Sequence, residues 1–228
     1  AEATLFQEVF VPSGLYYMVR DALVWTKEFL NDESIGVQDD HMAHLLIEVD
    51  GFSMDTLFAE CEKITALLEQ YDIDEILFAE DSVQKNKLWK LRRSVGEAVK
   101  SNTIYKEEDT VVPRFCLPEL LTVIKDLGRE YGFQSVCYGH AGDGNLHVNI
   151  VKGDMSDEKW NNELKEAIAK LFTEVKRMNG TISGEHGIGL VQKDFMPIVF
   201  NQVQLDLMKG IQVLFDPKGI MNPGKIFN

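Results

Sequence analysis

The feature that most constrains the fold is a glycine-rich turn between two apolar runs. Residues 135–140 and 145–151 flank Ala141-Gly142-Asp143-Gly144. Short apolar runs on either side of such a turn predict a β-hairpin. Because alternate residues of a strand share a face, His147 and Asn149 should project from one side of the second strand, with His140 at the end of the first. The sequence therefore predicts an antiparallel pair of strands that brings two imidazoles together.

Helical and strand patterns alternate along the rest of the chain. Apolar residues recur with helical spacing in several segments, and two further short apolar runs indicate strands. This pattern predicts an α+β domain with a largely antiparallel sheet and helices on one face, with a doubly wound α/β fold as the alternative. The expected helices are 15–30, 53–68, 83–100, 118–132, 156–178 and 197–215, and the further strands are 43–49 and 75–79.

The composition excludes several classes of partner. A formal net charge of −14 and a pI near 4.8 oppose binding to nucleic acid, and no run of lysine and arginine offsets them. No uninterrupted apolar stretch reaches the ~18 residues of a membrane span. Cys61, Cys116 and Cys137 are odd in number and widely spaced, so we expect buried thiols in a reducing compartment and a cytoplasmic protein.

A second motif, Thr181 to Gly189, places a carboxylate beside an imidazole between glycines. Glu185 would complete a two-histidine, one-carboxylate set with His140 and His147, which leaves positions open on zinc, manganese or iron. His186 is then free to act as a base near neutral pH. The alternatives are an ordinary hairpin with two surface histidines and a helix N-cap at Ser183.

A cationic segment lies on the helix expected at 83–100. Arg92 and Arg93 point in different directions on a helix, so at most one should enter a site, where a guanidinium fork suits a substrate carboxylate. Taken alone, both are more typical of solvated surface charges. We also expect the acidic run Glu107-Glu108-Asp109 to be solvated.

Three segments together resemble the C-terminal domain of the FAD-linked oxidase family. They are His140 to His147, Ser183 to Gly189, and the tail from Asp216-Pro217 to Asn222-Pro223-Gly224-Lys225, and the resemblance extends over 13–227. The family includes D-lactate dehydrogenases, the flavin subunit of glycolate oxidase and D-2-hydroxyglutarate dehydrogenase. It implies two ferredoxin-like subdomains, of which the first is here incomplete or rearranged. It also implies that residues 1–228 form the substrate- and metal-binding domain, while FAD is bound by an N-terminal domain that this chain does not contain.

The resemblance also assigns roles to single residues. His140, His147 and Glu185 are the implied metal ligands, with zinc as the first choice and manganese or iron as alternatives. His186 is the implied base for the substrate hydroxyl proton, and the residues implied to contact the substrate are Arg92, Lys106 and Asn149.

The expected activity is oxidation of a small 2-hydroxyacid to the 2-oxoacid, with hydride passing to FAD, and the isolated domain is expected to be inactive. The implied partners are the FAD-binding domain and an iron–sulfur electron-transfer protein. We expect the protein either free in the cytoplasm or bound peripherally to the inner membrane face. Rival functions are a non-redox module that binds a metal or a small acid, and a metallohydrolase that uses the same three ligands with a bound water.

Overall fold

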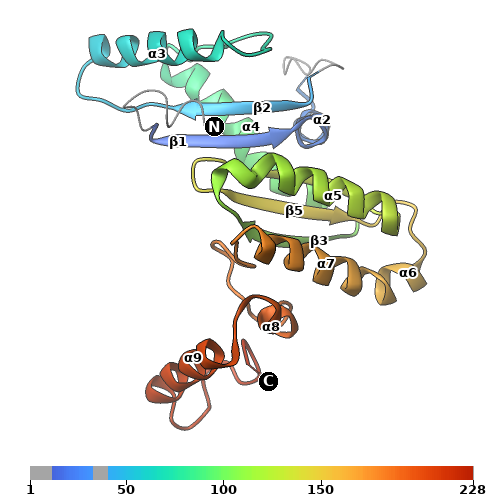
Figure 1. Ribbon diagram of the computed structural model, residues 1–228. Helices are drawn as coiled ribbons and strands as arrows, with labels where there is room; N and C mark the ends of the chain where they lie inside the picture. The colour runs from blue at the N-terminus through green and yellow to red at the C-terminus, as the bar shows by residue number, and fades with distance from the viewer. Residues whose placement is uncertain (1–11, 33–40, 228) are drawn as a thin grey trace.

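The strands form one antiparallel sheet in the computed structural model, which describes residues 12–32 and 41–227 (Figure 1). The strand order is β2-β1-β4-β5-β3, and every paired neighbour is antiparallel. The strands are β1 (Gly14–Val19), β2 (Ala43–Glu48), β3 (Tyr105–Val111), β4 (Gln134–His140) and β5 (Asn145–Val151).

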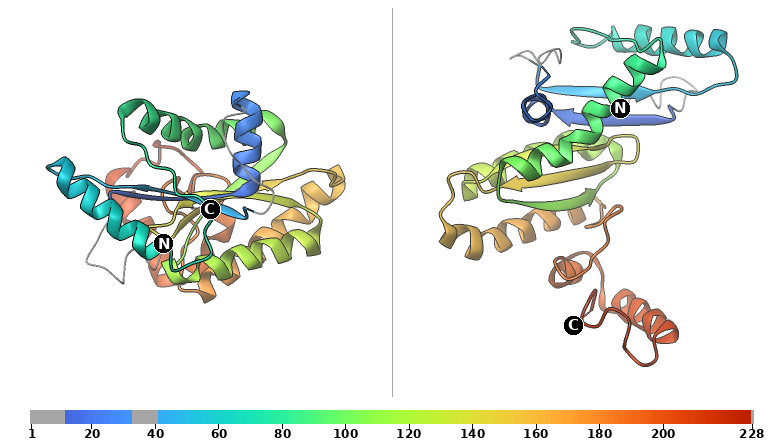
Figure 2. Two further views of the ribbon diagram at one scale, coloured as in Figure 1. Left: turned by 90° about the horizontal axis from the view of Figure 1, so that it is seen from above. Right: turned by 180° about the vertical axis from the view of Figure 1, so that it is seen from behind.

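Helices cover both faces of the sheet. Figure 2 shows α2 and α4 on one face and α5 and α7 on the other. The helix N-termini are capped where the sequence offers a cap: the side chains of Ser53, Asp81, Ser156 and Asn201 each accept a backbone N–H of the first turn. The helices are α2 (Arg20–Leu30), α3 (Met54–Leu68), α4 (Ser82–Asn102), α5 (Leu117–Tyr131), α6 (Asp157–Asn162), α7 (Leu164–Arg177), α8 (Met196–Val199) and α9 (Gln202–Phe215).

The glycine-rich turn joins β4 to β5 as the sequence predicts. His140 pairs with Asn145 in the register, and the amide of Asp143 donates to the carbonyl of His140 at 3.0 Å. Gly144 has a φ of 72°, and a Cβ there would lie 2.0 Å from the carbonyl oxygen of Val112. Glycine is therefore required at this position by both the backbone conformation and the neighbouring chain.

The main core lies between the sheet and the helices α5 and α7. Leu146, Val148 and Ile150 alternate with the polar residues of β5 and are buried, together with Leu120 of α5 and Phe172 of α7. This alternation leaves the opposite face of β5 free to carry Asn145, His147 and Asn149. One face of the strand stabilises the fold and the other presents polar groups.

The α+β class and the antiparallel sheet are confirmed. The described strands form one continuous sheet of five strands. The helices lie on both faces of this sheet and not on one only. In the described residues no helix combines the length and the apolarity that crossing a membrane requires.

Several expected elements are different in the structure. Residues 15–19, expected as the first part of a helix, form β1, because pairing with both β2 and β4 outweighs a helical spacing that a short apolar run cannot establish. Residues 75–79, expected as a strand, are irregular, and Leu77 and Phe78 are exposed. The segment before Thr110, expected to be irregular, contains β3. The helix expected at 197–215 is divided into α8 and α9, because Asn201 and Gln204 form a capping box that begins a new helix.

Candidate metal and substrate site

His147 is the centre of the site. It lies on β5, is almost fully buried, and is paired across the sheet with Tyr138 on one side and Asp109 on the other. Burial, together with the neighbouring His186, lowers the pKa of His147 to about 4. The ring is therefore neutral at neutral pH and has a nitrogen lone pair available for a ligand.

His140 and Glu185 converge on the same imidazole from two other segments. One carboxylate oxygen of Glu185 lies 3.1 Å from Nε2 of His147 and 3.8 Å from Nε2 of His140. The three side chains each offer a ligand atom, and these atoms all lie within 4.8 Å of one another. The structure thus brings together the three residues that the sequence predicts as metal ligands.

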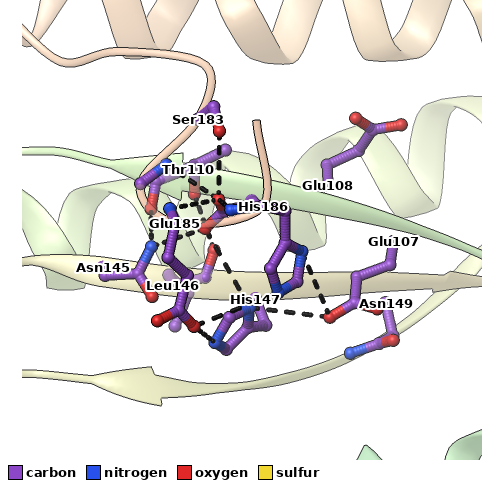
Figure 3. A network of polar contacts seen from close by, with 12 residues as sticks. Glu107, Glu108, Thr110, Asn145, Leu146, His147, Asn149, Ser183, Glu185 and His186 are labelled. Carbon is purple, nitrogen blue, oxygen red and sulfur yellow. Dashed lines mark hydrogen bonds and ion pairs between the residues drawn. The ribbon is translucent and has the colours of Figure 1, made fainter. Parts of the chain in front are cut away.

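Glu107 and His186 lie on the other side of the same ring. The Glu107 carboxylate is 3.5 Å from Nδ1 of His147 and 4.0 Å from Nδ1 of His186, and the two imidazoles are stacked with centroids 4.9 Å apart (Figure 3). These three side chains form a second group with metal-ligand spacing, which shares His147 with the first. Burial raises the pKa of Glu107, with His186 opposing this effect.

The prediction that the acidic run 107–109 is solvated is wrong. Glu108 is 0% exposed and Asp109 is 1% exposed, because β3 is covered on both faces. Figure 3 shows Glu107 and Glu108 extending from opposite sides of the strand. Asp109 is on the His147 side, where it accepts hydrogen bonds from the backbone of the 183–187 loop. The sequence signal that could have identified Glu107 and Asp109 is their i, i+2 spacing before the apolar pair Val111-Val112.

Arg92 approaches the site from α4. One of its terminal nitrogens is 3.4 Å from Nε2 of His140, and its guanidinium lies over the rings of Tyr16, at 5.0 Å, and Tyr138, at 5.6 Å. Two aromatic faces hold this cation in place. Arg93 instead lies over Trp89, so only one of the two arginines points to the site, as the helical spacing predicts.

Asn149 and Lys106 lie on opposite faces of the sheet. Asn149 is buried on the His147 face, where its side-chain nitrogen donates to the carbonyl of Val136 at 3.3 Å and its oxygen has no hydrogen-bond partner among the residues that the structure describes. Lys106 extends from the other face of β3, with Nζ 6.0 Å from the ring centroid of Trp160. The structure therefore brings His140, His147, Glu185, His186, Arg92 and Asn149 together, but it does not bring Lys106 to them.

A divalent metal fits the donor set of this site. Two imidazole nitrogens and one carboxylate oxygen suit zinc, manganese or iron, and three protein ligands leave positions open for a substrate. His147 is nearly buried, whereas the side chain of Glu185 is 50% exposed, so the group is open to solvent on one side. Such an opening is typical of a site that binds a small molecule beside a metal.

A family model matches nearly the whole chain. Residues 2–226 match the family described as "FAD linked oxidases, C-terminal domain". The D-lactate dehydrogenase of Anaerostipes hadrus is 31% identical over 225 residues, which cover 97% of this chain and 47% of that protein. The D-2-hydroxyglutarate dehydrogenase of Stutzerimonas stutzeri is 36% identical over 166 residues, which cover 70% of this chain and 35% of that protein. The chain thus spans about half the length of the first relative and a smaller share of the second.

Solved structures share the fold at low identity. A p-cresol methylhydroxylase with substrate bound is superposed with a TM-score of 0.64 and 10% identity, over 93% of this chain and 46% of that one. A 4-ethylphenol oxidase from Gulosibacter chungangensis gives a TM-score of 0.61 with 13% identity. At these identities the likeness concerns the fold alone.

Proposed function

Since the chain belongs to the FAD-linked oxidase family as its C-terminal domain, we propose that it is the substrate- and metal-binding part of a flavin-dependent D-2-hydroxyacid dehydrogenase. The observation that carries this proposal is the convergence of His140, His147 and Glu185 from β4, β5 and the 181–189 loop. Relatives named D-lactate dehydrogenase, glycolate oxidase subunit GlcD and D-2-hydroxyglutarate dehydrogenase support a small 2-hydroxyacid as the substrate class.

The metal ligands in this proposal are His140, His147 and Glu185. A divalent metal held there would act as a Lewis acid towards the hydroxyl and carboxylate oxygens of the substrate, and so lower the pKa of the hydroxyl. Zinc is our first choice for this set of donors, with manganese and iron as alternatives. His147 provides the buried ligand and Glu185 the exposed one.

His186 is the proposed base. Its Nε2 lies 3.9 Å from the Glu185 carboxylate and therefore faces the metal ligands, while Nδ1 faces Glu107. The imidazole side chain is 44% exposed, so a substrate can reach it. His186 would accept the hydroxyl proton at Nε2. A bound flavin would supply the acceptor for the hydride of C2, which completes the oxidation of the 2-hydroxyacid to the 2-oxoacid.

Arg92 is the proposed partner of the substrate carboxylate. The faces of Tyr16 and Tyr138 hold its guanidinium next to His140, so a carboxylate bound there would place the adjacent C2 hydroxyl near the metal ligands. Asn149, with its unpaired side-chain oxygen, would orient the substrate from the same face. Lys106 has no part in this proposal, because it extends from the opposite face.

The proposal requires a FAD-binding region, supplied by the rest of a longer protein or by a separate chain. Helix α9 offers a surface for it: none of its residues is buried, and Leu207, Ile211 and Leu214 are exposed. Figure 1 shows α9 standing away from the sheet, beside the C-terminal end of the chain. An apolar helix in this position is typical of a surface that another domain covers.

Metal content tests the site first. The purified chain should bind about one metal ion, and His140→Ala, His147→Ala and Glu185→Ala should each reduce the bound metal. His41→Ala is the matched control, because His41 pairs with Asp74 outside the site. Unchanged metal in all three site variants would exclude these ligands.

Dye reduction then tests the reaction. The chain joined to its FAD-binding region should reduce a dye with D-lactate, glycolate or D-2-hydroxyglutarate, and His186→Gln should reduce kcat about 100-fold or more without removing the metal. If no 2-hydroxyacid reduces the dye and the chain hydrolyses an ester or amide in a metal-dependent reaction, the metallohydrolase is favoured. Metal and hydroxyacid binding without either reaction would favour the non-redox module.

A further inference from the structure

The carboxylate of Asp109 is the most heavily hydrogen-bonded side chain near the site. Its Oδ1 accepts the side-chain amide of Asn145 at 2.6 Å. Its Oδ2 accepts three consecutive backbone N–H groups, and the hydroxyl of Ser183 also donates to it. The distances to Oδ2 are 2.8 Å from Gly184, 2.7 Å from Glu185, 2.8 Å from His186 and 3.3 Å from Ser183.

The segment that Asp109 binds has no regular secondary structure. Residues 182–192 form neither helix nor strand, and other contacts hold mainly its two ends: the bridge between Thr181 and Val111, and the hydrogen bond from Gln192 to Glu108. Between these ends the side chains of Glu185 and His186 are about half exposed, although the His186 ring stacks on His147. The position of the backbone allows that contact, and the Asp109 carboxylate accepts three consecutive amides of this backbone.

Asp109 also ties this segment to the buried ligand. It is the partner of His147 in the register between β3 and β5, so one side chain connects the loop to the strand that carries the imidazole. The contact is close: a Cβ on Gly184 would lie 2.3 Å from Nδ2 of Asn145 and 3.1 Å from the Asp109 carboxylate. Only glycine allows the loop to approach the strand at this distance.

From this arrangement we infer that Asp109 is a positioning residue, which holds Glu185 and His186 against His147 before a metal binds. The use of this ordered loop for binding a metal and a substrate rests on the proposed function. The positioning of the loop by Asp109 does not. Ordering the loop in advance reduces the entropy that metal and substrate binding would otherwise have to offset.

Asp109→Asn is the informative variant, because it keeps the size of the side chain. An amide has one acceptor oxygen, so either the loop amides or Asn145 must face an N–H group. Asn145 cannot turn over to compensate without losing its second bond, to the carbonyl of Thr110 at 3.2 Å. Glu108→Gln is the matched control: it neutralises the adjacent buried carboxylate of the same strand, on the face away from the site.

Amide hydrogen exchange of the metal-free chain, followed by NMR, tests the inference directly. In the wild-type protein, the amides of Gly184, Glu185 and His186 should be protected although they lie in a loop. Asp109→Asn should speed their exchange about tenfold or more, and Glu108→Gln should not. Zinc affinity, measured by competition with a chelator, should fall about 10-fold to 100-fold in Asp109→Asn only.

The outcomes separate this inference from the proposed function. Wild-type amides at 184–186 that exchange as fast as unprotected ones would overturn the inference, and this measurement needs no variant to fold. Unchanged exchange and zinc affinity in Asp109→Asn would also overturn it. Protected amides that Asp109→Asn releases, in a chain that binds no metal, would support the positioning role and contradict the metal site.

Discussion

Asp109 and Glu108 are adjacent on β3 and almost completely buried, but they face opposite sides of the sheet. On the site face, burial would raise the pKa of Asp109, yet hydrogen bonds from the loop amides and Asn145 outweigh this and hold the pKa below its usual value. On the face covered by α5 and α7, burial raises the pKa of Glu108 to about 7, and in the described part of the chain Gln192 is its one hydrogen-bond donor, at 3.0 Å. Burial raises the pKa of both carboxylates, and the number of hydrogen-bond donors decides whether this effect is outweighed.

The largest expected effect on stability comes from removing the carboxylate of Asp109, which accepts the hydrogen bonds on the site face. Asp109→Ala leaves three loop amides without an acceptor and removes one of the two acceptors of the Asn145 side chain, so we expect the free energy of unfolding to fall by about 3 to 5 kcal/mol. Urea denaturation would measure this change. Ser183→Ala removes one weak donor to the same carboxylate and the acceptor of the Gly187 amide, and should cost about 1 to 2 kcal/mol. Equal losses in both variants would contradict the role given to Asp109.

On the face covered by α5 and α7, removing a buried carboxylate should raise the free energy of unfolding and not lower it. Glu108 releases its proton near pH 4.5 in the unfolded chain but only near 7 in the folded one, so the folded state binds more protons between these values and stability falls as the pH rises. Glu108→Gln should remove this slope and raise the free energy of unfolding at about pH 8 by on the order of 3 kcal/mol. Denaturation at a series of pH values checks the prediction. A variant that is less stable than the wild type at that pH would refute it.

A smaller effect is expected where the loop meets the strand. Gly184→Ala places a methyl group against Nδ2 of Asn145, so the loop must shift, at a cost of about 1 to 3 kcal/mol. Metal affinity should weaken with it, which titration calorimetry would detect. Gly142→Ala is the matched control, because the added Cβ would meet only Leu15 at 3.5 Å, an ordinary contact. Similar affinities in the two variants would show that the loop tolerates displacement.

The smallest effect on stability and binding is expected for Lys106, which lies with Glu108 on the face covered by α5 and α7. Its ammonium lies 6.0 Å from the ring centroid of Trp160, where a cation–π contact contributes about 1 kcal/mol or less. Lys106→Ala should leave both metal affinity and the KM for the hydroxyacid unchanged. A clear rise in KM would show that Lys106 reaches the substrate, as the family resemblance implies and as its position on β3 does not.

The sequence predicted the parts of the fold that local chemistry determines. The hairpin at 141–144 and the caps at Ser53 and Ser156 depend on turn and cap residues, and both are present in the structure. The strand at 14–19 was expected as a helix, and a strand was expected at 75–79, because a short apolar run does not show whether a partner strand is available. In the described residues β1 has two partners and 75–79 has none.

The candidate site divides in the same way. His140, His147, Glu185 and His186 lie in two motifs whose glycines and spacing are visible in the sequence, and the structure brings them together. The i, i+2 spacing of Glu107 and Asp109 places them on one face only if the segment is a strand, and their contacts with His147 and the loop depend on the pairing of β3 with β5, which the acidic run does not show. Lys106 is implied as a substrate contact by the resemblance alone, and only the register shows that it occupies the opposite face of the strand.

Anomalous scattering from crystals of the chain soaked in zinc or manganese is the most direct test of the metal site. The ligand groups on the two sides of His147 use different nitrogens of one ring, so the position of the ion distinguishes them. We expect a single peak about 2.0 to 2.3 Å from nitrogens of His140 and His147 and from the Glu185 carboxylate. A peak between Glu107 and His186, or no peak at either group, would contradict it.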